Sequence, residues 1–172
     1  MSNASNIIAS DLCQACNLCC TGVLFQTVRL HPGDQPHTLN SLGLRLKKKQ
    51  GRHLIQQPCP AHQDGCCSIY LDRPSRCRLF ECDLLKKVEA GGLPAEDALE
   101  MIHDTVSKVR DIHQLLSKLG NKKTSQPLFP RCDSTLADTG STAEEQTQKK
   151  NLREKAVALQ QQLNAHFHQP NP

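Results

Sequence analysis

The fold depends on one stretch near the start of the chain, Asp11-Leu-Cys13-Gln-Ala-Cys16-Asn-Leu-Cys19-Cys20. Two successive Cys-x-x-Cys steps place three sulfurs on one tight turn, where they can converge on a single centre. Cys20 directly follows Cys19, and neighbouring side chains point in different directions on either a strand or a helix. We therefore expect Cys20 to serve a second centre or to remain a reactive thiol, with the rest of the protein arranged to hold the sulfurs together.

A second cysteine segment follows between residues 58 and 82. It contains Pro58-Cys59-Pro60 and then Gly65-Cys66-Cys67-Ser-Ile-Tyr70-Leu-Asp-Arg73-Pro74-Ser-Arg76-Cys77-Arg78-Leu-Phe80-Glu-Cys82. Nine of the ten cysteines lie in these two segments, so the segments are expected to meet in space. Together they would complete two four-thiolate sites, or one site beside functional thiols.

The composition limits the hydrophobic core. The chain has 172 residues, 37% of them hydrophobic, with no Trp, one Tyr and four Phe. We expect one domain with an appendage, and a core so modest that a disulfide or metal staple is needed. Residues 1–10 lack the basic start and apolar run of a secretory signal. We therefore expect a cytoplasmic protein with reduced thiols, in which clustered cysteines bind metal.

Hydrophobic periodicity predicts a small, irregular, metal-stapled α+β fold in which short strands surround the cysteines. Residues 23–30 and 52–56 predict strands. Residues 38–47 fit either a helix or a strand, and the helix is favoured. Residues 58–82 are too rich in Pro, Gly and Cys for long regular structure, and residues 1–10 predict a frayed polar start.

Two long helices are predicted after the cysteine segments, preceded by a short one that opens at Leu84. The first runs from Pro94 to Leu119 and buttresses the cysteine-rich half. Its apolar stripe consists of Leu99, Ile102, Val106, Val109, Ile112, Leu116 and Leu119. The second runs from Glu144 to about His166, with the stripe Leu152, Ala156, Leu159, Leu163 and Phe167.

The chain is expected to divide into three parts. A metal-binding domain with its buttressing helix occupies residues 11–119, a linker rich in Ser, Thr, Pro and Gly occupies 120–142, and a C-terminal helical appendage occupies 143–168. Within the linker, residues 127–132 are expected to dock back on the core. Whether the glutamine-rich last helix packs on the core or meets another chain stays open.

The cysteine pattern resembles that of the YkgJ-like cysteine-cluster proteins, whose shared domain is assigned to zinc or iron chelation. That family shows CxxCxxCC, then Cys-Pro, then a run ending in Arg-Pro-x-x-Cys-Arg-x-Phe-x-Cys. The resemblance covers residues 11–82 and the helix that follows, and leaves out Cys66, where the pattern varies, and Cys132. It implies eight metal ligands: Cys13, Cys16, Cys19, Cys20, Cys59, Cys67, Cys77 and Cys82.

Both zinc and iron suit these ligands. Cys-x2-Cys-x2-Cys is the ferredoxin step, in which three thiolates hold an iron–sulfur cluster and the fourth comes from afar. Structural zinc ribbons more often pair one CxxC with another at a distance. The spacing favours iron or an iron–sulfur centre, and zinc stays open. Arg73 and Arg78, which the resemblance covers, would offset the negative charge of such a centre or donate to its sulfurs. Arg76 fits this role and that of an ordinary solvated charge equally well.

One histidine and two aromatic residues, His62, Tyr70 and Phe80, lie near the cysteines in the sequence. His62 has ligand spacing from Cys59, but we expect it to be solvated. Tyr70 and Phe80 are expected to shield the centre as local core.

Three functions remain, in this order. The first is a metal-binding protein with a structural or electron-transfer role. The second is an enzyme in which the centre and a spare thiol, Cys20 or Cys66, modify a protein or peptide substrate. The third is a zinc module that binds nucleic acid or protein. No acid–base set supports an enzyme, and a net charge of +4 gives little support for nucleic acid. We expect no nucleic-acid or membrane partner, and leave a protein or peptide partner open.

Overall fold

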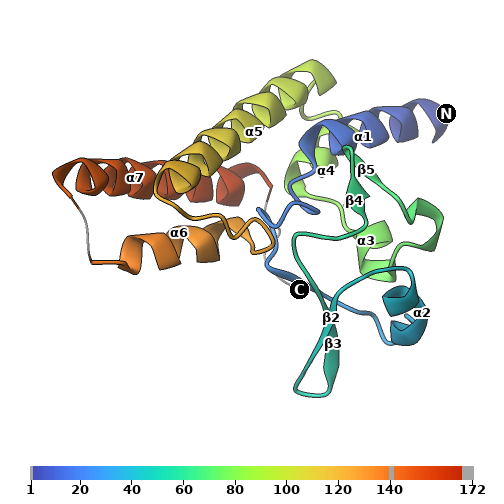
Figure 1. Cartoon of the computed structure of the whole chain (residues 1–172). Coiled ribbons are helices and arrows are strands. Elements are labelled where there is room, and N and C mark those ends of the chain that lie inside the picture. The colour runs from blue at the N-terminus through green and yellow to red at the C-terminus, as the bar shows by residue number, and fades with distance from the viewer. Residues whose placement is uncertain (1, 140–141, 168–172) are drawn as a thin grey trace.

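The protein is described from a computed structural model, which places residues 2–139 and 142–167 (Figure 1). These residues form helices and small antiparallel sheets, so the predicted α+β class is confirmed. The elements are α1 (Ser2–Cys16), β1 (Thr27–Arg29), α2 (Pro36–Ser41), β2 (Leu46–Lys49), β3 (Arg52–Gln56), β4 (His62–Gln63), β5 (Cys66–Cys67), the 3-10 helix η1 (Tyr70–Asp72), α3 (Ser75–Leu79), α4 (Asp83–Glu89), α5 (Ala95–Lys118), α6 (Leu128–Ala137) and α7 (Ala143–His166).

Three short strands form an antiparallel sheet in the order β1-β3-β2. The β2–β3 hairpin turns at Gln50 and Gly51, whose φ angles of 49° and 75° suit a two-residue turn that follows the strand twist. Figure 1 shows this hairpin projecting away from the helices. Its base packs on a small sheet core, which consists of Leu30, Leu39, Leu44, Ile55 and Ala61.

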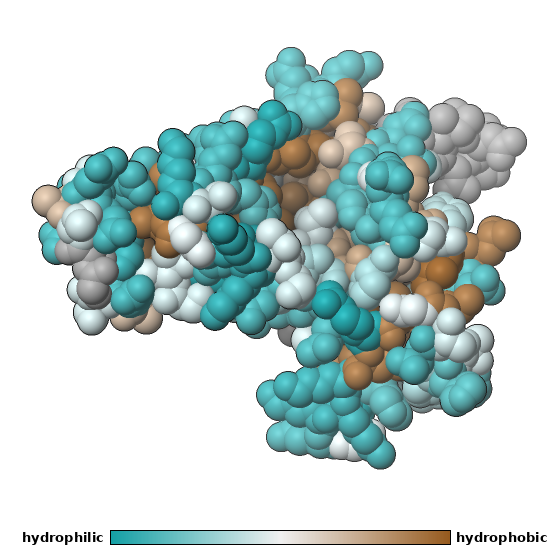
Figure 2. Space-filling view, in the orientation of Figure 1, coloured by the Kyte–Doolittle hydropathy of each residue, from teal (hydrophilic) through white to brown (hydrophobic). Residues whose placement is uncertain are grey.

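A larger helical core lies among α1, α4, α5, α6 and α7 (Figure 1). Its most buried side chains on the two long helices, all at most 1% exposed, are Ala98, Ile102, Ile112 and Leu116 of α5 and Leu152, Leu159 and Leu163 of α7. Phe167, just after α7, is also 1% exposed. In Figure 2 the helices present hydrophilic surfaces outward, with narrow hydrophobic seams between them. The last helix therefore packs on the core of its own chain.

The elements with the strongest periodicity lie where the sequence predicts them. α5 begins after Pro94 and ends before Leu119, and β3 has the predicted bounds. The stripe of α7 is buried throughout. On α5, Leu99 and Val106 are only partly buried, because Ala98 and Thr105 take the inner positions.

Several local predictions are wrong. Residues 1–10 are expected to form a frayed start, but from Ser2 onward these residues are helical and belong to α1. The strand expected at 23–30 is reduced to β1, because Val23 and Leu24 are buried in the helical core. Residues 38–47 hold the end of α2 and the start of β2, not one helix.

The segment expected as a linker contains α6. Its predicted docking is confirmed, since Leu128 and Cys132 are each 1% exposed. α7 begins with a capping box, in which the Thr142 hydroxyl accepts the backbone N–H of Glu145. The predicted end of the appendage at residue 168 lies outside the described residues. No helix in the described ranges is long and apolar enough to cross a membrane.

Candidate metal centre

The first cysteine segment folds as a helix end followed by turns. Cys13 and Cys16 lie on the last turn of α1, and not on one tight turn as predicted. Asn17 ends the helix in the left-handed conformation, with φ of 53°, and its backbone N–H donates to the carbonyl of Cys13 at 3.0 Å. The backbone N–H of Cys20 then donates to the carbonyl of Asn17 at 3.0 Å. This turn keeps Cys19 and Cys20 beside the end of the helix.

Gly22 joins this turn to two other parts of the chain. Its φ is +74°, and a Cβ atom there would lie 3.2 Å from both the Cα of Pro127 and the backbone nitrogen of Pro58. Its carbonyl accepts the backbone N–H of Leu128 at 3.0 Å. Glycine adopts this left-handed conformation without strain and so relieves the tight turn. The same glycine lets the start of α6 and the loop before Cys59 approach the cysteine turn.

Four cysteines form a first group on the helical side: Cys13, Cys16, Cys19 and Cys82. Cys82 lies at the N-terminal end of α4, which contacts α1. Burial raises the pKa of the Cys16 thiol to about 12, and the nearby Cys82 and Cys13 add to this rise. Burial, followed by Cys16, Cys20 and Cys82, keeps the pKa of Cys19 well above its usual value. Partial desolvation and Cys82 raise the pKa of Cys13, although this residue is exposed as a whole.

Four other cysteines form a second group on the side of the sheet: Cys20, Cys59, Cys67 and Cys77. The backbone N–H of Cys59 donates to the carbonyl of Cys20 at 2.8 Å, so the two cysteine segments touch at this point. Cys67 lies on β5 and Cys77 on α3. Burial first, and then Cys20, Cys59 and Cys67, raise the pKa of Cys77 to about 12. Burial, then Cys59 and Cys67, raise that of Cys20 to about 11.

The two cysteines left out of the ligand set, Cys66 and Cys132, differ from each other in their burial. Cys66 is exposed on β5, where it pairs with Gln63 of β4. Cys132 is buried on α6 in the helical core, and burial raises its pKa to about 11. Cys132 is therefore a packing residue of the helices.

Within each group the thiols are electrostatic neighbours. Among residues 2–139 and 142–167, no three His, Cys, Asp or Glu side chains converge as metal ligands do. Burial raises the pKa of Cys16 and Cys77 to about 12 and that of Cys20 to about 11, because their thiolates would be desolvated and would be repelled by neighbouring thiolates. A metal ion bound by these sulfurs would displace their protons.

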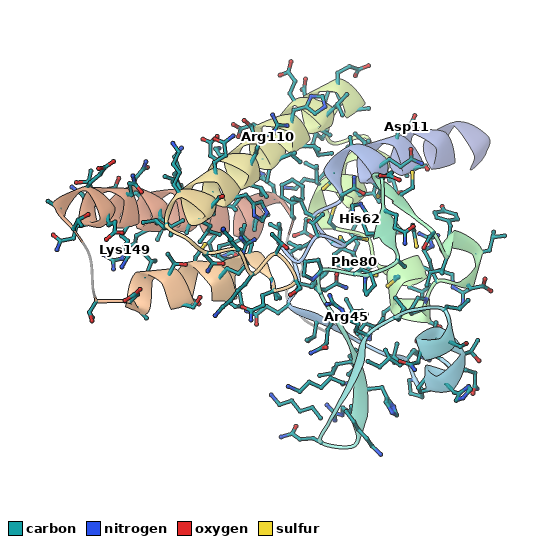
Figure 3. The ribbon with its side chains drawn as sticks, in the orientation of Figure 1. Asp11, Arg45, His62, Phe80, Arg110 and Lys149 are labelled. Atoms are coloured by element: carbon teal, nitrogen blue, oxygen red, sulfur yellow. The ribbon has the colours of Figure 1, made fainter. Side chains whose placement is uncertain are left out.

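His62 has a buried ring nitrogen beside the second group. Its Nε2 has no hydrogen-bond partner within the described part of the chain. The residue pairs with Cys67 across the β4–β5 hairpin, and its backbone N–H donates to the carbonyl of Cys59 at 3.1 Å. Figure 3 shows His62 near the middle of the molecule. The prediction of a solvated His62 is wrong, because its Nε2 is buried. This nitrogen can form a hydrogen bond with a thiol or bind a metal.

Arg73 is the arginine whose charge reaches both groups. Burial raises the pKa of Cys13, Cys20 and Cys77, and the charge of Arg73 lowers all three. The Arg73 guanidinium also lies 3.7 Å from the ring centroid of Tyr70. Its predicted position beside the sulfurs is confirmed, whereas Arg76 and Arg78 are exposed.

The two aromatic residues beside the cysteines differ. Phe80 packs edge-on against Phe25, with 4.9 Å between ring centroids, and is partly buried against the helical core. Figure 3 shows Phe80 between the helices and the sheet. Tyr70 is 53% exposed, so the prediction that it shields the cysteines is wrong. The Arg73 guanidinium covers its ring instead.

The donor set fits a metal that prefers sulfur. Each group offers four cysteines from two or more chain segments. The second adds the imidazole Nε2 of His62, which has no hydrogen-bond partner among the residues that the structure describes. Thiolates with some imidazole suit zinc, iron and iron–sulfur clusters, whereas calcium and magnesium need oxygen ligands. The chemistry of these donors therefore favours zinc or iron.

Comparison with known proteins agrees with this chemistry. Residues 12–108 match a protein-family model described as "CxxCxxCC: Putative zinc- or iron-chelating domain". This match covers more than half of the 172 residues and includes both cysteine segments and much of α5. No curated protein and no solved structure matches the chain. The chain belongs to the zinc- or iron-chelating CxxCxxCC domain family, as its resemblance to the YkgJ-like proteins indicates.

Proposed function

We propose that this protein binds zinc or iron through eight cysteine thiolates and uses the metal in a structural or redox role. One observation carries the proposal: two segments separated by about forty residues bring their cysteines together at the junction of the two cores. The ligands are Cys13, Cys16, Cys19, Cys20, Cys59, Cys67, Cys77 and Cys82. The family description supports zinc or iron chelation in general.

A structural role follows from where these residues lie. A metal held by them would tie α1 to α4 and the Cys20 turn to β5 and α3. Most of these elements are short, and an unfolded chain would not hold their sulfurs together. Binding energy at such a site is therefore also folding energy. Metal would supply the staple that a chain with few aromatic residues needs.

The kind of centre follows from the first segment. Cys13, Cys16 and Cys19 keep the ferredoxin spacing, and Cys82, more than sixty residues later in the chain, lies near enough to raise the pKa of Cys16, after burial as the main cause. Three close thiolates with a distant fourth are the usual ligands of a four-iron cluster. We therefore propose iron or an iron–sulfur cluster ahead of zinc, with electron transfer as the redox role.

Anaerobic purification tests this proposal. Metal and acid-labile sulfide would be measured on the full chain, together with its visible spectrum. Iron with sulfide and a brown colour supports a cluster. A colourless protein with stoichiometric zinc supports chelation in a structural role and contradicts electron transfer. Protein that takes up neither metal, either as purified or after anaerobic reconstitution, would overturn the proposed function.

A further inference from the structure

We infer that the eight cysteines form two separate four-cysteine metal centres that meet at the peptide bond between Cys19 and Cys20. One centre consists of Cys13, Cys16, Cys19 and Cys82. The other consists of Cys20, Cys59, Cys67 and Cys77. This inference rests on the proposed chelation of zinc or iron, and goes beyond it by assigning each sulfur to a centre.

The first centre belongs to the helical core. Cys16, Cys19 and Cys82 are partly buried against that core, and none of them packs on the sheet core. Cys13 lies one helical turn before Cys16 on α1, on the same face. Because α1 contacts α4, the end of α1 and the start of α4 form two walls of one site. The turn that carries Cys19 closes the third side.

The second centre belongs to the sheet core. Cys59, Cys67 and Cys77 are partly buried against Leu30, Leu39, Leu44, Ile55 and Ala61, and none of them packs on the helical core. The β4–β5 hairpin and the bond from the Ser68 N–H to the Ala61 carbonyl at 2.8 Å hold Cys67 near Cys59.

Cys20 joins the second centre through the backbone. Its carbonyl accepts the N–H of Cys59 at 2.8 Å, which fixes these two residues side by side. Cys19 is its neighbour in sequence but packs on the helical core. Adjacent residues with different orientations can reach two sites and are poorly placed for the same one.

The electrostatic neighbours agree with this division. Burial is the main cause of every raised thiol pKa, and the next thiol contributors mostly lie within the same group. For Cys77 these are Cys20, Cys59 and Cys67, and for Cys13 the contributor is Cys82. Cys20 also interacts with Cys13, Cys16 and Cys19 of the other group, as expected where the centres meet.

Arg73 lies where the centres meet. Its charge acts on Cys13 in one group and on Cys20 and Cys77 in the other. Zinc and four-iron clusters each take four protein thiolates, so eight thiolates suffice for two centres and exceed what one can use. Two such anionic centres repel, and a shared cation between them reduces that repulsion.

Paired substitutions test the assignment. Cys16→Ser with Cys82→Ser removes half of the first centre, and Cys59→Ser with Cys77→Ser removes half of the second. Cys66→Ser is the control, because Cys66 adjoins Cys67 in sequence but lies outside both groups. Each protein would be analysed for metal by native mass spectrometry, for protected thiols by alkylation and peptide mapping, and for fold by far-ultraviolet circular dichroism.

The expected results are two centres in the parent and in the control, and one centre in each double variant. Loss of Cys16 and Cys82 exposes Cys13 and Cys19 to alkylation and leaves the other group protected. One centre in the parent, or loss of all metal from a double variant that stays folded, overturns the assignment. A parent that takes up no metal contradicts the proposed chelation itself.

Stepwise metal removal provides the second measurement if a double variant does not fold. The parent protein is titrated with a chelator, and thiols are alkylated at each step. The two-centre assignment predicts that thiols lose protection in two sets of four with the stated membership. Loss of protection by all eight together, or in sets that mix the groups, overturns it.

Discussion

Among the glycines that the structure describes, Gly22 is the one where an added Cβ atom would lie closest to other parts of the chain. It combines a left-handed backbone with close approach to the backbone of two prolines, Pro58 and Pro127. The turn it forms places Cys19 and Cys20, and its carbonyl anchors the start of α6. One residue therefore connects the cysteine turn, the Cys59 loop and the helices, and any side chain there disturbs all three.

Gly22→Ala is expected to destabilise the protein more than a glycine substitution with equal backbone strain. Gly91→Ala is the matched control, since its φ is +73° and nothing lies within 4 Å of the added Cβ. Left-handed strain costs about 1–2 kcal/mol in both variants. Overpacking against Pro58 and Pro127 adds about 1–3 kcal/mol at Gly22 alone. Urea unfolding measures the difference, and equal losses in the two variants would contradict the contact.

His113 gives a pH dependence with a definite sign. Its Nδ1 lies 3.0 Å from Nη1 of Arg131, which can only donate, so the imidazole is neutral and accepts. Burial first, and then the Arg131 charge, lower the pKa of His113 below its ordinary value of 6.5. The unfolded chain binds the proton more readily, so the free energy of unfolding falls as the pH drops below 6.5.

His113→Asn keeps an acceptor for Arg131 but cannot titrate. Unfolding measured between pH 5 and 8 is therefore expected to show a weaker loss of stability at low pH in this variant than in the parent. All other histidines are shared by the two proteins, so the difference isolates His113. If the free energy of unfolding changes with pH equally in the parent and the variant, His113 does not lose proton affinity on folding.

Among the elements, the β2–β3 hairpin contains an unfavourable pair. Lys49 lies directly opposite Arg52 beside the turn, and like charges in that position destabilise a sheet. No carboxylate occurs in the sequence between Asp34 and Asp64 to offset these charges locally. The hairpin is held instead by its turn geometry and by Leu46 and Ile55 at its base.

Lys49→Glu is expected to raise stability by about 0.2–1 kcal/mol, because it replaces repulsion with attraction across the strands. Lys47→Glu is the control, since Lys47 lies opposite Leu54 and not opposite a charge. The gain should shrink in high salt, which screens exposed charges. If both variants gain the same stability, the gain comes from the change in net charge and not from the pairing of residue 49 with Arg52.

On the glutamine-rich helix α7, a buried residue and an exposed residue are expected to contribute very differently to stability. Leu159 is fully buried against the helical core, whereas Val157 is 52% exposed. Leu159→Ala is expected to cost about 2–5 kcal/mol, and Val157→Ala less than about 0.5 kcal/mol. Thermal and urea unfolding should show one transition that moves as a whole. A second, independent transition would mean that α7 unfolds apart from the rest.

For the whole molecule, the sequence predicts the long helices and the family better than the arrangement of the cysteines. α5 and α7 were predictable because their apolar stripes are long and regular. α1 and α6 were missed because residues 1–10 and 127–137 are polar or contain Pro, and their helical state depends on packing of Leu12, Leu128 and Cys132. Local composition does not report such tertiary contacts.

The division of the sulfurs into groups likewise required the structure. Sequence spacing indicates that Cys13, Cys16 and Cys19 belong together and that Cys20 differs, but Cys82 comes from the start of another helix. Its neighbours depend on how α4 packs against α1. The buried Nε2 of His62 had no signal beyond its spacing from Cys59, because the β4–β5 pairing that buries it involves only two residues on each strand.

Metal bound by cysteine thiolates is the proposal on which the function of the whole molecule depends. X-ray absorption spectroscopy at the edge of the metal that copurifies measures its ligands directly. We expect about four sulfur ligands per metal at about 2.3 Å, with iron neighbours in addition if a cluster is present. A shell dominated by nitrogen or oxygen at about 2.0–2.2 Å would contradict thiolate coordination.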